Sequence, residues 1–132
     1  MQKKRNKRVL LVALGALAIL LAVGLTAMGQ VVKRAKGLPV SSPSLSTVAD
    51  GLYLGEYAIE PVQVKVLVEV AGGKLQSVEI LSHVNGLGRA AEVLAKTLVE
   101  KQSLEVDAVA GATVSSKCIV KAVEAALSKG RV

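Results

Sequence analysis

Residues 62–81, VQVKVLVEVAGGKLQSVEIL, carry the pattern that decides the fold. Valine occupies every second position from Val62 to Val70, which is the period of a strand with one buried face. The pair of glycines that follows predicts a tight hairpin turn, and the segment LQSVEIL then resumes the alternation. The stretch therefore predicts two antiparallel strands whose valine face covers a hydrophobic core.

The flanking segments complete a small α+β domain. GLYLGEYAI, residues 51–59, is expected to form another strand, with Gly55 as a candidate bulge. Apolar residues recur at helical spacing from Arg89 to Lys101 and again from about Val114 to Ser128. The expected fold is a small antiparallel sheet, a hairpin extended to a meander, with helices packed on one face.

The first third of the chain has the composition of a membrane anchor. From Val9 to Met28 there are 20 residues without a charged side chain, enough for a helix to cross a hydrocarbon core of about 30 Å. Five basic residues precede this run and three follow it, which favours a cytoplasmic N-terminus. The alternative is a cleaved signal peptide, because Ala27-Met28-Gly29 has the small residues of a cleavage site. The apolar run is, however, longer than the usual h-region of roughly 7 to 15 residues.

We therefore expect four parts. They are a basic cytoplasmic N-terminus over residues 1–8, a transmembrane helix over 9–32, a linker over 33–49 and a folded domain over 50–132. The linker contains two prolines, several hydroxyl residues and little periodic hydrophobicity. This organisation predicts a single-pass protein of a prokaryotic cell membrane whose C-terminal domain is extracytoplasmic.

The formal net charge of +7 is unevenly distributed and does not indicate nucleic-acid binding. Residues 1–36 carry eight basic and no acidic side chains, and the remainder carries nine basic against ten acidic, so the two parts have charges of +8 and −1. Basic residues that flank a membrane span are attracted to anionic lipid. With two tyrosines and no Phe or Trp, the chain also has few rings for stacking on bases. The expected partner is a membrane and not a nucleic acid.

Cys118 is the only cysteine, which excludes an intrachain disulfide and a multi-cysteine metal site. It is expected to be a small buried residue of the core. The sequence shows neither a Ser, His and carboxylate pattern typical of a hydrolase nor a G-x-G-x-x-G motif for a nicotinamide cofactor. We therefore expect no catalytic residues and no metal ligands.

The segment DAVAGATVSSK, residues 107–117, precedes the last predicted helix and has two interpretations. In the first, Thr113, Ser115 or Ser116 is an N-cap that accepts a bond from a free backbone N–H group. In the second, the small residues before the helix leave the backbone accessible to a phosphate, which free N–H groups and the positive end of the helix dipole both favour. Spacing alone leaves both interpretations open.

In its surroundings this motif resembles that of the FMN-binding domain family, which is found in peripheral subunits of sodium-pumping NADH:quinone reductase and of Rnf complexes. Residues 107–115 resemble D-x-x-[ST]-G-A-T-x-[ST], except that Ala110 stands where the family usually has Ser or Thr. DGLYLGEY resembles the family's opening D-G-x-Y-x-G, and SHVNGLG resembles a shortened form of its His-containing, Gly-rich loop. The resemblance extends over residues 50–128 and includes the central hairpin.

The resemblance implies that Thr113 carries covalent FMN through a phosphoester bond, which a separate flavin transferase forms from FAD. It implies further cofactor-binding residues in the motif and in the preceding loop, namely Asp107, Gly111, Ala112, Val114, Ser115, His83, Gly86 and Gly88.

Some of these residues have a second interpretation. His83 either contacts the flavin or moves protons, or it is an ordinary loop histidine. Gly86 and Gly88 either let the loop approach the flavin ring or simply separate a strand from a helix. Asp107 either caps the turn before the motif or orients the motif for the transferase.

The expected function is that of a membrane-anchored flavoprotein that carries electrons, a carrier or redox-complex subunit rather than a self-contained enzyme. Its expected partners are the membrane, the flavin transferase, and redox proteins in or on the membrane. The alternative is a non-redox or reversibly FMN-binding interaction module of the same fold.

Overall fold

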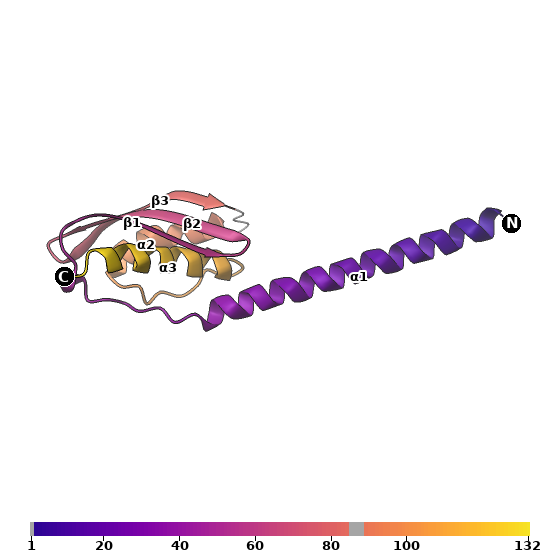
Figure 1. Ribbon diagram of the computed structural model, residues 1–132, viewed down its shortest axis with the longest axis horizontal. Helices are drawn as coiled ribbons and strands as arrows, with labels where there is room; N and C mark the ends of the chain where they lie inside the picture. Colours follow the sequence, from indigo (N-terminus) through magenta and orange to yellow (C-terminus); the bar gives the residue numbers. More distant parts are fainter. Residues whose placement is uncertain (1, 85–88) are drawn as a thin grey trace.

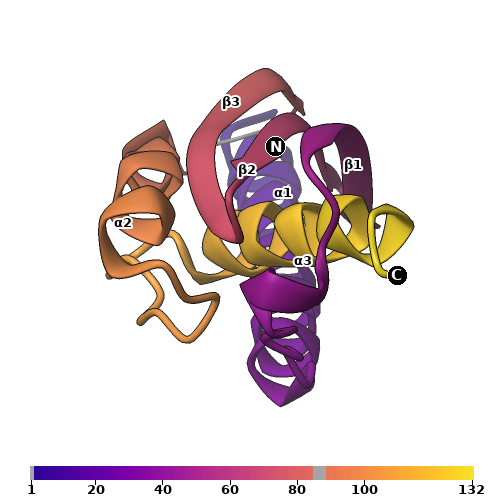
Figure 2. The same cartoon turned by 90° about the vertical axis from the view of Figure 1, so that its left-hand side faces the viewer.

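The computed structural model describes residues 2–84 and 89–132 and has a long helix that projects from an α+β domain (Figure 1). The elements in chain order are α1 (Gln2–Gly37), the 3₁₀ helix η1 (Leu45–Thr47), β1 (Gly51–Ile59), β2 (Val62–Ala71), β3 (Lys74–Val84), the 3₁₀ helix η2 (Arg89–Glu92), α2 (Val93–Lys101) and α3 (Thr113–Lys129). The three strands form one antiparallel sheet in the order β1-β2-β3. α3 lies against β1 and β2, and α2 lies beside β3 (Figure 2). The predicted fold class is confirmed.

The hairpin at the centre of the sheet forms as its sequence predicts. All five alternating valines of β2 are buried, and the residues between them are exposed or only partly buried. Gly72 and Gly73 have φ angles of 60° and 69°, the left-handed conformation that a two-residue type I′ hairpin turn requires at both positions. The local twist of this turn matches that of the two strands, which fixes their pairing register.

β3 contains two irregularities that the alternation in its sequence did not predict. Its pairing with β2 steps from Lys65↔Ser82 to Val66↔Ile80, which leaves Leu81 as an extra residue, and a second step leaves out Gln76. At such a bulge two successive residues point to the same face, and Leu81 and Ser82 are both exposed. The next residue, His83, therefore lies on the inner face of the sheet. Strict alternation from Ile80 would have placed it on the outer face.

Gly55 is not a bulge, contrary to the expectation. It pairs regularly with Val66, and the neighbouring pairs show no shift in register. A Cβ atom at this position would overlap the carbonyl oxygen of Ala122 and crowd Ala126. The glycine is needed because α3 packs its backbone directly onto β1.

The two predicted helices of the domain are present, and apolar residues that recur at helical spacing form their buried faces. The stripe of α3 is completely buried: Cys118, Ile119, Ala122, Val123, Ala126 and Leu127 all have an exposed fraction of 0%. The helix begins at Thr113, one residue before the predicted start. In the segment from Arg89, the first four residues form the 3₁₀ helix η2, and only the rest is α-helical. Ala91 of η2 and Leu94 and Leu98 of α2 are buried, so the inner face continues from one helix into the other.

α1 is longer than the predicted transmembrane helix, since it continues to Gly37. Among the described residues it is the one helix long and apolar enough to cross a membrane. Its most apolar 18-residue stretch contains no buried residue, and side chains such as Val12 and Leu25 are 72% and 75% exposed. Its last turn packs on α3, where Ala35 has an exposed fraction of 0%.

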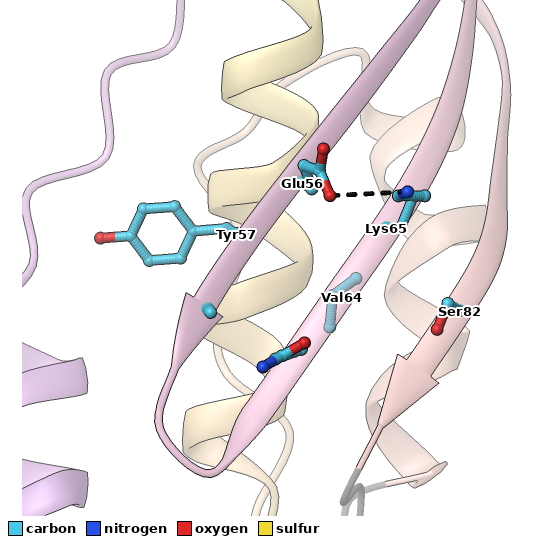
Figure 3. A pocket seen from close by; sticks show the side chains of 7 residues that line it. Glu56, Tyr57, Val64, Lys65 and Ser82 are labelled. Carbon is cyan, nitrogen blue, oxygen red and sulfur yellow. Dashed lines mark ion pairs between the residues drawn. The ribbon is translucent and has the colours of Figure 1, made fainter.

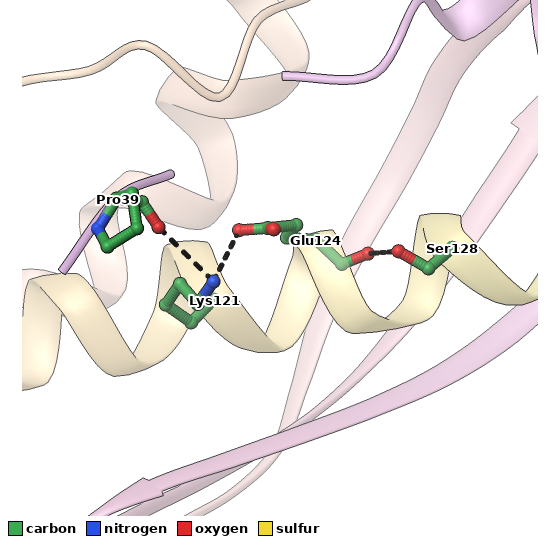
Figure 4. Close-up of polar contacts among 4 residues, drawn as sticks. All are labelled: Pro39, Lys121, Glu124 and Ser128. Atoms are coloured by element: carbon green, nitrogen blue, oxygen red, sulfur yellow. Dashed lines mark hydrogen bonds and ion pairs between the residues drawn. The ribbon is translucent and has the colours of Figure 1, made fainter. Parts of the chain in front are cut away.

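The segment between α1 and β1 runs along the domain and is attached to it at several points. Val48 is buried and forms a β-bridge with Arg131, and the N–H of Ala49 donates to the carbonyl of Gly130 at 2.8 Å. Nearer to α1, the Lys121 ammonium donates to the Pro39 carbonyl oxygen at 3.3 Å (Figure 4). The segment residues that make these contacts, Pro39, Val48 and Ala49, all precede the expected domain boundary at residue 50.

Candidate functional site

The segment before α3 is a tight turn. The N–H of Ala112 donates to the Val109 carbonyl at 2.9 Å, and Gly111 at the third position has a φ angle of 75°. A type II turn places its third residue in this conformation and therefore favours glycine there. A Cβ atom on Gly111 would meet nothing within 4 Å. The glycine is thus required by the backbone conformation, and the space beside it is open.

The three hydroxyl groups of the motif have different surroundings, and none of them caps the helix. The N-cap residue of α3 is Ala112, which makes no side-chain capping bond, so the N-cap interpretation of these hydroxyls is wrong. Ser116 has an exposed fraction of 2%, and its Oγ donates to the Ala112 carbonyl at 2.7 Å and accepts from the N–H of Val109 at 3.0 Å. Ser116 therefore fastens both ends of the turn to the helix.

Ser115 belongs to a chain of hydrogen bonds that joins three elements. His83 of β3 lies with Nε2 3.0 Å from Ser115 Oγ and with Nδ1 3.1 Å from Glu92 Oε1 of η2. Because an ionised carboxylate can only accept, Nδ1 carries the proton toward Glu92, and in the neutral ring Nε2 accepts the Ser115 hydroxyl hydrogen. The His83 side chain is 4% exposed and Ser115 is 3% exposed.

This chain corrects two expectations. His83 is not a loop histidine, since it lies in β3 and both ring nitrogens have partners. A Ser, His and carboxylate set is also present, although the sequence showed no such pattern, because His83 and Ser115 are 32 residues apart. Ser115 is almost completely buried and already bonded, so the set holds the start of α3 against β3 and η2 and offers no accessible nucleophile.

Thr113 differs from both serines. It is partly exposed, and its hydroxyl has no hydrogen-bond partner among residues 2–84 and 89–132. It lines a cavity of about 390 Å³ between the last turns of α1 and the first turn of α3. The lining residues are Met28, Val31, Val32, Pro61, Val62, Gly111, Ala112, Thr113, Val114 and Ser115. Seven of these ten have apolar side chains, so the cavity combines one free hydroxyl with largely apolar walls, as small-molecule sites do.

Comparison with known protein families matches residues 60–128, just over half of the chain, to the FMN-binding domain. The chain belongs to the FMN-binding domain family. No curated protein and no solved structure matches it. The family therefore establishes a flavin-binding role, and the matched range contains the whole Thr113 motif together with His83.

The other predicted flavin-site residues do not all share this cavity. His83 is not among its lining residues and contacts it only through its bond to Ser115. Gly111, Ala112, Val114 and Ser115 share the cavity of Thr113. Asp107 does not, because it lines a separate hollow of about 290 Å³ together with Leu104 and Lys117. The predictions for Gly86 and Gly88 lie outside the described residues.

A third hollow lies on the outer face of the sheet and has a different character (Figure 3). It contains the ion pair between Lys65 and Glu56, with a separation of 3.6 Å, and Ser82 at its margin. The pair is solvent-exposed, with side chains 48% and 72% accessible, so it contributes little to stability. None of the predicted flavin-site residues lines this hollow.

Cys118 occupies the core position that was predicted for it. Its exposed fraction is 0%, and Sγ lies 3.9 Å from the Val62 carbonyl oxygen. Burial raises the pKa of this thiol above its ordinary value of 9.0. The uncharged, enclosed thiol is therefore a packing group rather than a nucleophile.

Proposed function

We propose that this protein is a membrane-anchored flavoprotein that carries electrons through FMN attached by a phosphoester bond to Thr113. The observation that carries the proposal is the difference among the three hydroxyls of the motif. Ser115 and Ser116 are buried and bonded, whereas the Thr113 hydroxyl is partly exposed and without a partner among the described residues. Only this hydroxyl is open to a modifying enzyme.

The residues around Thr113 fit the two chemical parts of FMN. A phosphate on Oγ1 would lie at the N-terminus of α3, where free N–H groups and the helix dipole favour an anion. Gly111 leaves open space on the same side. The apolar part of the cavity suits a flat heteroaromatic ring. When bound, FMN supplies the one- and two-electron redox chemistry that protein side chains lack.

The exposed surface of α1 supports the membrane anchor. Its most apolar 18-residue stretch has no buried side chain, and a lipid bilayer is the environment in which such a helix is stable. The basic residues on either side favour a cytoplasmic N-terminus and an extracytoplasmic domain. In this arrangement a flavin transferase loads the domain, and redox proteins in or on the membrane exchange electrons with it.

The test is to coexpress the full chain with a flavin transferase, extract it in detergent, denature it, and measure its mass and flavin emission. We expect the added mass of one FMN and emission that survives denaturation. Thr113→Val should abolish both without unfolding the domain. Thr97→Val on α2, a partly buried threonine whose hydroxyl only bonds the Val93 carbonyl, is the matched control and should load normally.

The other outcomes identify the alternatives. Emission that is lost on denaturation would mean reversible FMN binding. An unmodified mass in a folded wild-type chain would favour a non-redox interaction module, for which Ala110 is the relevant departure from the motif. The same mass measurement shows whether the N-terminal segment is retained.

A further inference from the structure

The last turns of α1 face the same cavity as Thr113. Met28, Val31 and Val32 line it from one side, and the residues of the motif line it from the other. We propose that α1 is part of the flavin site, with Met28, Val31 and Val32 forming the wall against which the ring system of the flavin on Thr113 packs. This inference rests on the function proposed above and assigns to the anchor a second role in cofactor binding.

The sequence of α1 carries this face as a pattern. Met28, Val31, Val32 and Ala35 follow the spacing i, i+3, i+4, i+7, which places them in one stripe along a helix. The residues that point elsewhere are polar and exposed: Gln30, Lys33, Arg34 and Lys36. Of the four stripe residues only Ala35 lies beyond the charge-free run, which ends at Val32, so the stripe connects the end of that run to the docked last turn of α1. The stripe is what a helix needs when it packs on a domain.

This wall is held in place by contacts at its C-terminal end. Ala35 has an exposed fraction of 0%, and α1 contacts α3. Just beyond it, Lys121 of α3 donates to the Pro39 carbonyl at 3.3 Å and forms an ion pair with Glu124 at 2.9 Å (Figure 4). Val40 then packs against the core. The end of α1 is therefore docked on the domain and does not merely lie near it.

The chemistry of the cavity favours the flavin ring as its occupant. A group attached to the Thr113 hydroxyl starts inside the cavity, so a covalent tether gives it a high local concentration that a lipid tail or detergent molecule lacks. Among the described residues no aromatic side chain lines the cavity, and its apolar walls are aliphatic apart from the Met28 thioether. A thioether makes favourable contacts with an aromatic ring system. Without α1, this surface of α3 and the β1–β2 turn would leave the ring open to water.

The experiment measures how accessible the attached flavin is to acrylamide, a neutral quencher, in the full chain in detergent. Val31→Asn places an amide in the wall, whereas Gln30→Asn places the same group one residue away on the exposed side. We expect the quenching constant to rise about two-fold or more in the first variant, because a ligand pocket normally shields most of its ligand, and to stay at the wild-type value in the second. Val32→Asn and Lys33→Asn form a second matched pair.

Flavin emission comes only from molecules that carry FMN, so a change in the fraction of loaded molecules does not alter the quenching constant of the flavin. Tyrosine emission from β1 verifies that each variant is folded, and the second pair serves if a variant of the first does not fold. Equal quenching within both pairs, or a wild-type flavin as accessible as free FMN, would overturn the role of α1 and leave the proposed function standing. A wild-type chain without covalent flavin would overturn both.

Discussion

The two ends of α3 differ in how closely the rest of the chain approaches them. Toward the C-terminal end, a Cβ atom on Gly55 would overlap Ala122, and one on Gly130 would overlap the Tyr53 ring. At the N-terminal end, a Cβ atom on Gly111 would meet nothing within 4 Å. The same helix is thus locked into the core at one end and borders open space at the other. The proposed flavin site lies at the second, open end.

Substitution of Gly55 by Ala should have the largest effect on stability. The new methyl group would overlap a backbone carbonyl of α3, which can move only if the helix is displaced. Because overpacking of this kind typically costs 1–3 kcal/mol and a backbone atom cannot rotate away, we expect a loss of about 3 kcal/mol or more in the free energy of unfolding.

Urea unfolding of the full chain in detergent, followed by tyrosine emission, measures this effect, since both tyrosines lie in β1 and report on the domain alone. A loss of less than about 1 kcal/mol would mean that α3 adjusts without cost, and the contrast between its two ends would then be weak.

Ser116→Ala should have an intermediate effect. It leaves the N–H of Val109 without its acceptor in a partly buried position, and an unsatisfied buried donor costs about 1–3 kcal/mol. Ser128→Ala is the matched control, because Ser128 makes the same bond to the carbonyl four residues earlier but is exposed (Figure 4). Equal stability of the two variants in the same unfolding measurement would show that the turn does not depend on Ser116.

Gly111→Ala should have the smallest effect on stability, although it changes the motif itself. The methyl group meets no neighbour, so the cost is that of holding alanine in the left-handed conformation, about 1 kcal/mol. We expect clear loss of flavin loading with little loss of stability, the reverse of Gly55→Ala. Destabilisation comparable to that of Gly55→Ala would show that the N-terminal end of α3 is as tightly constrained as the other.

The strands and the buried helix stripe were predictable because they follow local periodicity. The valines of β2 and the stripe of α3 repeat at the periods of a strand and a helix, and burial follows directly from that repetition. Gly55 was recognised as unusual, but the reason for it lies on α3, more than 60 residues away. Sequence spacing identifies such a glycine and does not identify its neighbour.

The site was predicted less completely, since its geometry depends on contacts between distant segments. The family motif pointed to Thr113, whereas spacing alone suggested a cap that the structure does not have. The bonds of His83 to Ser115 and Glu92 require the bulge at Leu81, and no pattern in the sequence marks that bulge. The sequence did not predict the cavity wall on α1, because the apolar stripe falls across the predicted transmembrane helix and linker and has the composition expected of both.

In the proposed anchored arrangement, the unbroken run of α1 from the charge-free segment to its docking point would set how the domain stands above a bilayer. Ala35 lies three positions after Val32, where the charge-free segment ends, which is a rise of about 5 Å along a helix. A flexible linker would let the domain sweep through a wide volume, whereas a helical stalk holds it at one height and in one orientation. For a protein anchored as proposed, electron partners would have to reach the cavity by lateral diffusion in the plane of the membrane, because the domain cannot swing out to meet them.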